Sequence, residues 1–470
     1  MKKIVLVIAV VAVLTSAAWL GKSRLTGTPP SVSAAVATAE KAGRSGEAPS
    51  TRPVAPAAGS FQQNVTQQEV PFKKPGSKYT FHRAFEVGCR VFNNVGYAGG
   101  TAYFDCGSED AIIAVDIASG QEKWRFKPGE FVTDPVFREG LVFAVGEHNI
   151  YAIDPATGKR AWQADAHFNH DSMSPPQPAV QDRRAYIMGV TDCQLHVLDA
   201  RTGQPRWDYS YCDARALPAA QTSTSSSRLW IETAGLAAPV VAGDKVYLTT
   251  SVYDGPNKRA FQRIHAIDIV THHEVWSHDF DQMMLLAPVI DGGRLFVVDM
   301  AAAFNYALSD SKPATHGSSA AVCLDAATGK ELWSFRVSEA LSDFAASNGV
   351  LVLSSTYDLP SSSSSNPMSG GRVYGLDAAT GNRLWSFDTT GEVKSSVFIA
   401  GGGAIFESWT ANKQLYSNHI YARDLKTGGH RWELRQEDAQ CQMPDLKLVE
   451  VGTLWLLSQD DQKSGFWRVQ

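Results

Sequence analysis

The chain has 470 residues, of which 44% are hydrophobic and 19% are charged, and its formal net charge is −5. This hydrophobic share is typical of a globular protein. Because the net charge is negative and the sequence holds no block of basic residues, nucleic acid is excluded as the main partner.

The N-terminal residues predict export. Lys2 and Lys3 precede an uncharged, mostly apolar run from Ile4 to about Leu20. Residues 1–21 are therefore expected to be a secretory signal peptide, cleaved near Ala17 and Ala18, or an N-terminal anchor in the inner membrane. We expect a periplasmic or otherwise exported protein, and the six cysteines suit such an oxidising compartment.

Residues 22–77 are rich in Ala, Pro, Ser, Thr and Gly. A segment of this composition cannot bury a core and predicts a disordered linker. The remaining residues, 78–470, are expected to form one domain, because one phrase repeats through them.

The repeated phrase is an Asp followed eight residues later by a Trp, and Asp-x-x-Thr-Gly is its commonest beginning. The seven copies are Asp116 with Trp124, Asp154 with Trp162, Asp199 with Trp207, Asp268 with Trp276, Asp325 with Trp333, Asp377 with Trp385 and Asp424 with Trp432. An apolar, β-prone run precedes each Asp, and the Asp and Gly are typical of a tight turn. Each copy therefore predicts a four-stranded antiparallel unit, strands A to D, in which the phrase spans the C–D hairpin.

The residue two positions before the Asp is small in six copies, Val197 being the exception. A small residue beside a recurrent Trp predicts a socket for the indole. Burying an indole removes about 150–250 Å² from water, so we interpret the seven Trp residues as structural, holding one unit against the next.

The phrase resembles the tryptophan-docking motif of PQQ-type β-propellers, a family that includes quinoprotein dehydrogenases and BamB-type outer-membrane assembly lipoproteins. The resemblance implies an all-β propeller over residues 78–470. BamB-type lipoproteins carry a lipobox cysteine, whereas this chain has no Cys before Cys89, so lipidation is not carried over.

Three further strand-like runs follow Trp432, and residues 79–87 offer a fourth strand at the other end of the domain. We therefore expect an eight-bladed β-propeller of four-stranded antiparallel blades, with the last blade closed by both termini and Phe81 or Phe85 in place of the Trp. Closure removes exposed sheet edges, and a monomer is expected.

The cysteines leave more than one pairing open. Cys193 with Cys212, or Cys89 with Cys106, could form a disulfide, because each pair flanks one strand. Cys323 occupies the small-residue socket and is expected to be a buried thiol.

The candidate partner-binding residues lie in the B–C loops, which share one face with the D–A connectors. These loops are short in blades 1–3 and long in blades 4–7, at residues 253–259, 301–319, 357–371 and 409–418, and a long D–A connector at 208–235 joins them. Long loops on a rigid scaffold are where binding residues concentrate, although tolerated insertions would give the same pattern. The candidates are Tyr253, Asp254, Tyr357, Asp358 and Trp409.

No catalytic residue and no metal ligand is assigned. His167, His170 and Asp171 could be half of a metal site but are better explained as a polar loop, and His272 with His273 as a solvated turn. The quinoprotein dehydrogenases that the chain resembles have an adjacent cysteine pair and Ca²⁺ ligands, and no Cys-Cys occurs here.

Two hypotheses follow. The favoured one is a non-catalytic scaffold that binds a protein or peptide in the bacterial cell envelope, in envelope or outer-membrane protein assembly, and needs no cofactor. The alternative is a quinoprotein oxidoreductase that binds PQQ with Ca²⁺.

Overall fold

The computed structural model describes most of the repeat region. The described residues are 81–87, 89, 91, 95–107, 109–165, 178–189, 192–211, 230–234, 238–254, 259–280, 287–298, 319–358, 369–389, 391–393, 397–412, 415–435, 444–450, 453–459 and 464–469, all in one compact unit, Val54–Gln470. The expected signal or anchor segment (1–21) and linker (22–77) lie outside them. No helix long and apolar enough to span a membrane occurs in the described part of the chain.

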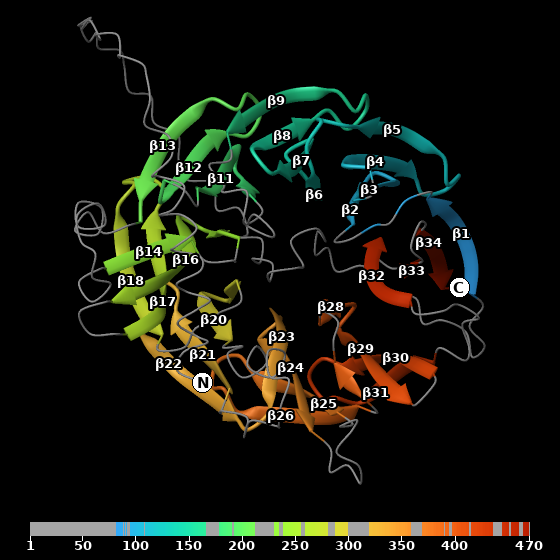
Figure 1. The fold of residues 1–470 in the computed structure, drawn as a ribbon. Coiled ribbons are helices and arrows are strands. Elements are labelled where there is room, and N and C mark those ends of the chain that lie inside the picture. Colours follow the sequence, from blue (N-terminus) through green and yellow to red (C-terminus); the bar gives the residue numbers. More distant parts are fainter. Residues whose placement is uncertain are drawn as a thin grey trace, which may run out of the picture. The chain divides into compact units, whose positions relative to one another are not determined.

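The described strands form eight antiparallel sheets, which follow one another in chain order around a ring within this unit (Figure 1). We number them blades 1 to 8. Blade 1 contains β2 (Gly96–Ala98), β3 (Thr101–Cys106), β4 (Ala111–Asp116) and β5 (Glu122–Phe126); blade 2 contains β6 (Val132–Arg138), β7 (Leu141–Gly146), β8 (Asn149–Ile153) and β9 (Arg160–Asp165); blade 3 contains β10 (Ala179–Gln181), β11 (Arg184–Gly189), β12 (Gln194–Asp199) and β13 (Pro205–Ser210). The fold is therefore an all-β propeller, and eight sheets are consistent with the predicted eight blades.

The later blades follow the same A-to-D order with two additions. Blade 4 contains β14 (Trp230–Ala234), β15 (Val240–Ala242), β16 (Lys245–Asp254), β17 (Arg259–Asp268) and β18 (Glu274–Phe280); blade 5 contains β19 (Val289–Asp291), β20 (Arg294–Val298), β21 (Ser319–Asp325) and β22 (Glu331–Val337); blade 6 contains β23 (Ala340–Ser347), β24 (Val350–Asp358), β25 (Ser369–Asp377) and β26 (Arg383–Thr389); blade 7 contains β27 (Glu392–Val393), β28 (Phe398–Ala400), β29 (Gly403–Asn412), β30 (Leu415–Asp424) and β31 (His430–Arg435). The additions are β14 and β27, which pair with the B strands of blades 4 and 7.

Both ends of the domain build blade 8, as predicted. Its strands are β32 (Pro444–Glu450), β33 (Thr453–Gln459), β34 (Ser464–Val469) and β1 (Phe81–Val87). β1 pairs with β34 in an antiparallel register that runs from Phe81 opposite Val469 to Val87 opposite Ser464. The first strand of the domain is therefore the outer strand of its last blade.

The register selects one of the two residues predicted to replace the Trp. In blades 1 to 7 the C–D ladder shifts directly after the pair that contains the Trp, as between Ala114 opposite Trp124 and Val115 opposite Glu122. In blade 8 the same shift follows the pair of Phe466 and Phe85. Phe85, rather than Phe81, therefore occupies the position of the repeated Trp.

The hydrophobic core is divided among the spaces between neighbouring blades. One cluster joins Tyr103, Ala114 and Trp124 of blade 1 to Val142 and Tyr151 of blade 2, all buried. Successive side chains of a strand point to opposite faces of the sheet. Because both faces of a blade carry apolar side chains, each blade contributes to the core on both sides.

One of the two predicted disulfides is present. Cys89 and Cys106 form a disulfide and are both buried. Cys193 is also disulfide-bonded, to a partner outside the described residues. Cys323 is a buried free thiol, as expected, and burial raises its pKa to about 12.

The B and C strands of blades 4, 6 and 7 extend into the regions expected to be long loops. The B and C strands have 10 residues each in blade 4, nine each in blade 6 and 10 each in blade 7, against six and six in blades 1 and 3. In blade 7 the ladder continues to Asn412 opposite Leu415, so the expected loop at 409–418 is a β-hairpin. We call β16–β17, β24–β25 and β29–β30 the extended hairpins; the blade 5 loop, apart from Ser319, lies outside the described residues.

Candidate functional site

Each repeated Asp builds the turn that follows it. Asp154 shows the pattern: its Oδ1 accepts bonds from the backbone N of Ala156 at 3.0 Å and from the N and Oγ1 of Thr157, both at 2.8 Å. Hydrogen bonds from Thr157 hold the pKa of this carboxyl below its usual range. The carboxylate is thus used within its own turn, which makes a structural explanation sufficient.

Five of the repeated Trp side chains reach into the next blade. The Nε1 of each donates to the carbonyl of the residue after the next Asp: Trp124 to Pro155 at 2.8 Å, Trp162 to Ala200 at 3.0 Å, Trp276 to Ala326 at 3.2 Å, Trp333 to Ala378 at 3.2 Å and Trp385 to Leu425 at 2.9 Å. The turn Gly of that blade lies directly against the same indole, because a Cβ on Gly329 would come within 2.5 Å of Trp276. The small residue lies opposite the Trp in its own sheet, as Ala266 does opposite Trp276.

The junction between blades 3 and 4 departs from this pattern. His272 replaces the turn Gly, with a φ of 61°, and its ring stacks on Trp207 with 4.4 Å between ring centroids. Because His272 carries a Cβ, this turn cannot lie as close to the Trp207 indole as the Gly turns lie to theirs. Trp207 Nε1 and Tyr186 Oη are buried here without a hydrogen-bond partner, whereas in blade 4 the matching Tyr247 Oη donates to Ala326 O at 2.9 Å.

The candidate binding residues lie on the extended hairpins. Tyr253 and Asp254 are at the end of β16, Tyr357 and Asp358 are at the end of β24, and Trp409 lies within β29. For Tyr253, Asp254 and Asp358 the structure describes the backbone but not the side chains, and His167, His170 and Asp171 lie outside the described residues.

Tyr357 belongs to a charged cluster at the end of the blade 6 hairpin. The guanidinium of Arg372 lies 5.4 Å from the centroid of the Tyr357 ring, and Arg372 also pairs with Asp388 and with Glu339, the latter at 2.8 Å. Tyr374 Oη donates to Glu339 at 2.8 Å. Burial raises the pKa of Tyr374 to about 12, so this hydroxyl stays protonated and the cluster is fixed at neutral pH.

Trp409 lies where blades 6 and 7 meet. Its Nε1 donates to the buried Glu407 carboxylate at 3.0 Å, and its backbone pairs with Glu392 of β27. β27 in turn adjoins blade 6: a Cβ on Gly371 of β25 would come within 2.8 Å of Val393. The structure therefore joins the hairpins that carry Tyr357 and Trp409 into one support, a link that sequence spacing could not reveal.

Three side chains of blade 4 are hydrogen-bonded in the order hydroxyl, imidazole and carboxylate, which is the order found in a catalytic triad. Glu274 Oε2 lies 2.6 Å from His265 Nδ1, and His265 Nε2 lies 3.1 Å from Thr250 Oγ1. Acyl transfer would need an accessible hydroxyl, and Thr250 is fully buried. We therefore assign this series a structural role.

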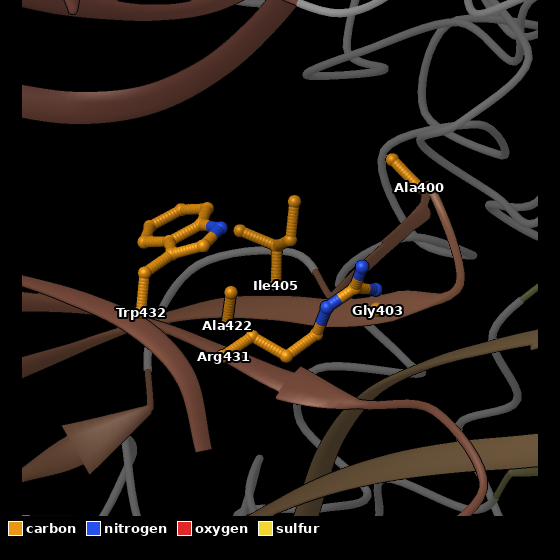
Figure 2. Close-up of a pocket in the computed structure, with 6 residues that line it drawn as sticks. All are labelled: Ala400, Gly403, Ile405, Ala422, Arg431 and Trp432. Carbon is orange, nitrogen blue, oxygen red and sulfur yellow. The ribbon is translucent and has the colours of Figure 1, made fainter. Parts of the chain in front are cut away.

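One small recess lies on the face of blade 7 that carries Trp432 (Figure 2). It is lined by Ala400, Gly403, Ile405, Ala422, Arg431 and Trp432, and its volume is about 10 Å³. This is barely room for one water molecule, so the recess does not suit a cofactor of the size of PQQ. Among the described residues, no group of three or more His, Cys, Asp or Glu side chains is placed to hold a metal ion.

Together, the repeated turns and the interblade Trp contacts define a β-propeller of PQQ-like repeats. The family model for the outer membrane protein assembly factor BamB matches residues 81–220, 215–312 and 307–450. The chain therefore belongs to this family.

Two curated relatives match short regions. The outer membrane protein assembly factor BamB of Burkholderia pseudomallei is 28% identical over 114 residues, which span 24% of this chain and 28% of that protein. The serine/threonine-protein kinase AfsK of Streptomyces coelicolor is 28% identical over 104 residues, or 22% of this chain and 13% of the kinase. The matched regions thus cover less than a third of either relative.

Solved structures share the fold. The quinohemoprotein alcohol dehydrogenase of Comamonas testosteroni has a TM-score of 0.55 at 13% identity, covering 88% of this chain and 80% of that chain. The computationally designed Ika8 protein has the same TM-score and identity, covering 82% and 99%. At this identity the likeness concerns architecture alone, because one fold hosts many functions.

Proposed function

We propose that this propeller is a non-catalytic scaffold that binds a protein or peptide partner in the bacterial cell envelope, in the assembly of outer-membrane proteins. Membership of the BamB family supports the setting. The observation that carries the proposal is the set of extended hairpins on blades 4, 6 and 7, which project from one face of an otherwise regular ring.

The partner is proposed to engage the B–C and D–A face over blades 4 to 7. Tyr357 and Trp409 supply aromatic surface there, and aromatic side chains are enriched among the residues that dominate binding energy. The Glu339–Arg372–Asp388 cluster and the β27 link hold the hairpins in place, which lowers the ordering cost of association.

The proposed location is periplasmic or exported, with residues 1–21 either cleaved or retained as an inner-membrane tether. The apolar run that follows Lys2 and Lys3 supports this proposal. A monomer is proposed, since blade 8 is completed within the chain itself.

The test shortens the extended hairpins to the length found in blade 2. In blade 6, residues 356–371 are replaced by Asn-Gly, so that Ser355 and Arg372 flank the new turn; blade 7 is shortened correspondingly. Purified wild-type and shortened proteins are then crosslinked in native envelopes, and the captured proteins are identified by mass. Capture of outer-membrane assembly components by the wild type and its loss on shortening would support the proposal.

The matched control alters the opposite face. Lys159 and Lys330, exposed in the C–D turns of blades 2 and 5, are changed to Glu in a protein with intact hairpins. If capture survives shortening but is lost in this control, the long hairpins are tolerated insertions and the assignment is wrong.

The competing candidate, suggested by the resemblance of the repeated phrase to that of quinoprotein dehydrogenases, is a PQQ-binding oxidoreductase. We expect no binding of PQQ with Ca²⁺ at micromolar concentration, because the sequence lacks the adjacent cysteine pair of the quinoprotein dehydrogenases that it resembles. Titration followed by absorbance and by native mass checks this expectation. Stoichiometric PQQ, or quinone-dependent dehydrogenase activity, would overturn the scaffold proposal.

A further inference from the structure

The strand that closes the ring is covalently attached to the neighbouring blade beside its end. β1 ends at Val87, and Cys89, two residues later, forms the disulfide with Cys106 at the end of β3. β1 belongs to blade 8 and β3 to blade 1. The disulfide therefore fastens the outer strand of the last blade to the second strand of the first.

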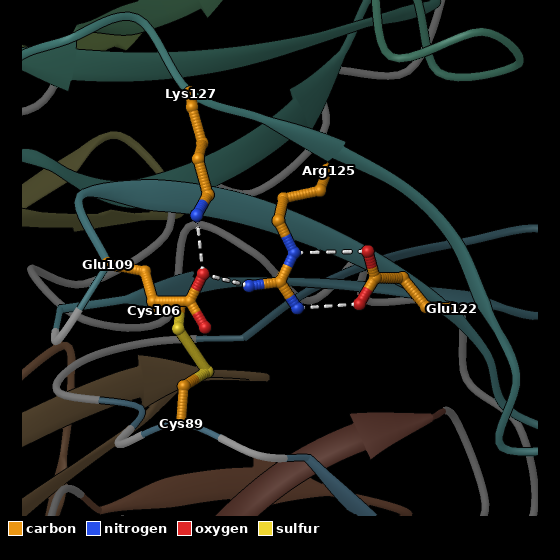
Figure 3. Close-up of a disulfide and its surroundings, with 6 residues drawn as sticks. All are labelled: Cys89, Cys106, Glu109, Glu122, Arg125 and Lys127. Carbon is orange, nitrogen blue, oxygen red and sulfur yellow. Dashed lines mark hydrogen bonds and ion pairs between the residues drawn. A yellow bond between two sulfur atoms is a disulfide. The ribbon is translucent and has the colours of Figure 1, made fainter.

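The two halves of this attachment differ in how else they are held. The turn after Cys106 is fixed to the outer strand of blade 1: Glu109 N donates to Cys106 O at 2.9 Å, and the Glu109 carboxylate binds Arg125 and Lys127, the latter at 2.6 Å (Figure 3). Arg125 also pairs with Glu122 of β5 at 2.7 Å. The hydrogen bonds from Lys127 and Arg125 hold the pKa of Glu109 below its usual range, so this carboxylate is charged at neutral pH and anchors the Cys106 side independently of the disulfide.

On the Cys89 side, the described residues are held by burial and by the disulfide. Cys89, Val91 and Val95 pack in one core cluster with Phe104 and Cys106 of β3. β1 itself is held by its ladder to β34, which has the same register shift as the outer strands of the other seven blades. Unlike those strands, β1 is not joined to its neighbour by a hairpin, because it comes from the start of the domain. The covalent link therefore contributes most on this side.

We propose that the Cys89–Cys106 disulfide is a redox-sensitive latch on the strand that closes the propeller. Oxidised, it keeps β1 against β34. A dithiol reductant opens it: a thiolate of the reductant attacks one sulfur to form a mixed disulfide, its second thiol displaces the remaining cysteine, and two protein thiols and one oxidised dithiol result. Because both sulfurs are fully buried, attack requires local opening of the segment around Cys89.

The experiment measures amide hydrogen exchange in the full chain, comparing the wild type with Cys89→Ser/Cys106→Ser. Without the disulfide, amide exchange in β1 and β34 should become about tenfold faster or more, because the cross-link no longer restricts local separation of β1 from β34. Exchange in β22 to β26, across blades 5 and 6, should not change. Cys193→Ser is the matched control, because it removes the other disulfide half and should leave β1 and β34 protected.

A second measurement keeps the inference testable if the double variant does not fold. Folded wild-type protein is treated with dithiothreitol, alkylated at intervals and analysed by mass and exchange together. Accelerated exchange in β1 and β34 once Cys89 and Cys106 become alkylated supports the latch. Unchanged exchange in these strands after complete alkylation, or an equal rise all round the ring, would overturn it.

Discussion

At the scale of single residues, the one repeat whose turn has no Gly shows what this Gly contributes in the others. At the blade 3–4 junction, His272 adopts a positive φ that favours Gly, and its ring stacks on Trp207. The stack recovers about 0.5–1.5 kcal/mol. The buried Trp207 Nε1 and Tyr186 Oη have no hydrogen-bond partner, and each such group costs about 1–3 kcal/mol.

His272→Gly is therefore expected to stabilise the protein by about 1–3 kcal/mol, because relief of backbone strain and recovery of the two hydrogen bonds outweigh the lost stack. Urea unfolding of the two proteins measures the change. The reverse change, Gly329→His at the blade 4–5 junction, should destabilise. A lower melting temperature for His272→Gly would show that the stack outweighs both gains.

A second residue gives a pH dependence. The hydrogen bond from His265 lowers the pKa of Glu274 to about 2, against about 4.3 in an unfolded chain. A depressed carboxyl pKa stabilises the fold above the unfolded value, and this contribution disappears as pH falls from about 4.3 towards 2. Glu274→Gln should thus reduce unfolding free energy at pH 7 but hardly at pH 2.5; a constant difference at both pH values would contradict this.

At the scale of elements, the C–D turn and the Trp of the preceding blade act as one unit. Gly381 in blade 6 has a φ of 73°, and a Cβ there would approach Trp333 to 2.7 Å. Gly349, in the A–B turn of the same blade, has a φ of 75° and nothing within 4 Å of such a Cβ. The two glycines differ in the indole contact and match in conformation.

Gly349→Ala is expected to cost about 1–2 kcal/mol from backbone strain alone. Gly381→Ala should cost about 1–3 kcal/mol more, because the Trp333 indole must move out of its packed position. Unfolding free energies of both variants, measured in urea, give the difference. Equal costs would mean that the indole moves freely and that the turn is not a packing surface.

At the scale of the whole molecule, closure depends on a strand supplied from the start of the domain. β1 pairs with β34 over six residue pairs. If it is removed, the edge of β34 is left open to other chains.

Removal of residues 1–77 should leave the unfolding free energy nearly unchanged, because β1 is retained. Removal of residues 1–88 should open blade 8 and cause aggregation. Size-exclusion chromatography and urea unfolding distinguish the two. A soluble, cooperatively folding 89–470 fragment would show that the ring closes without β1.

The sequence alone determined the repeat, its turn chemistry, the all-β propeller and the closing role of residues 79–87. These follow from local patterns: an Asp and a Gly at fixed spacing define a turn, and strand runs alternate around it. The candidate residues Tyr357 and Trp409 were also identified from sequence position.

Only the tertiary structure decided the rest, because it depends on pairing between segments distant in the chain. Register selected Phe85, opposite Phe466, as the residue in place of the Trp and turned the expected loop at 409–418 into a hairpin. Packing between blades brought Cys89 to Cys106 and His272 to Trp207. Such contacts are set by how sheets pack against each other, which residue spacing within one blade does not encode.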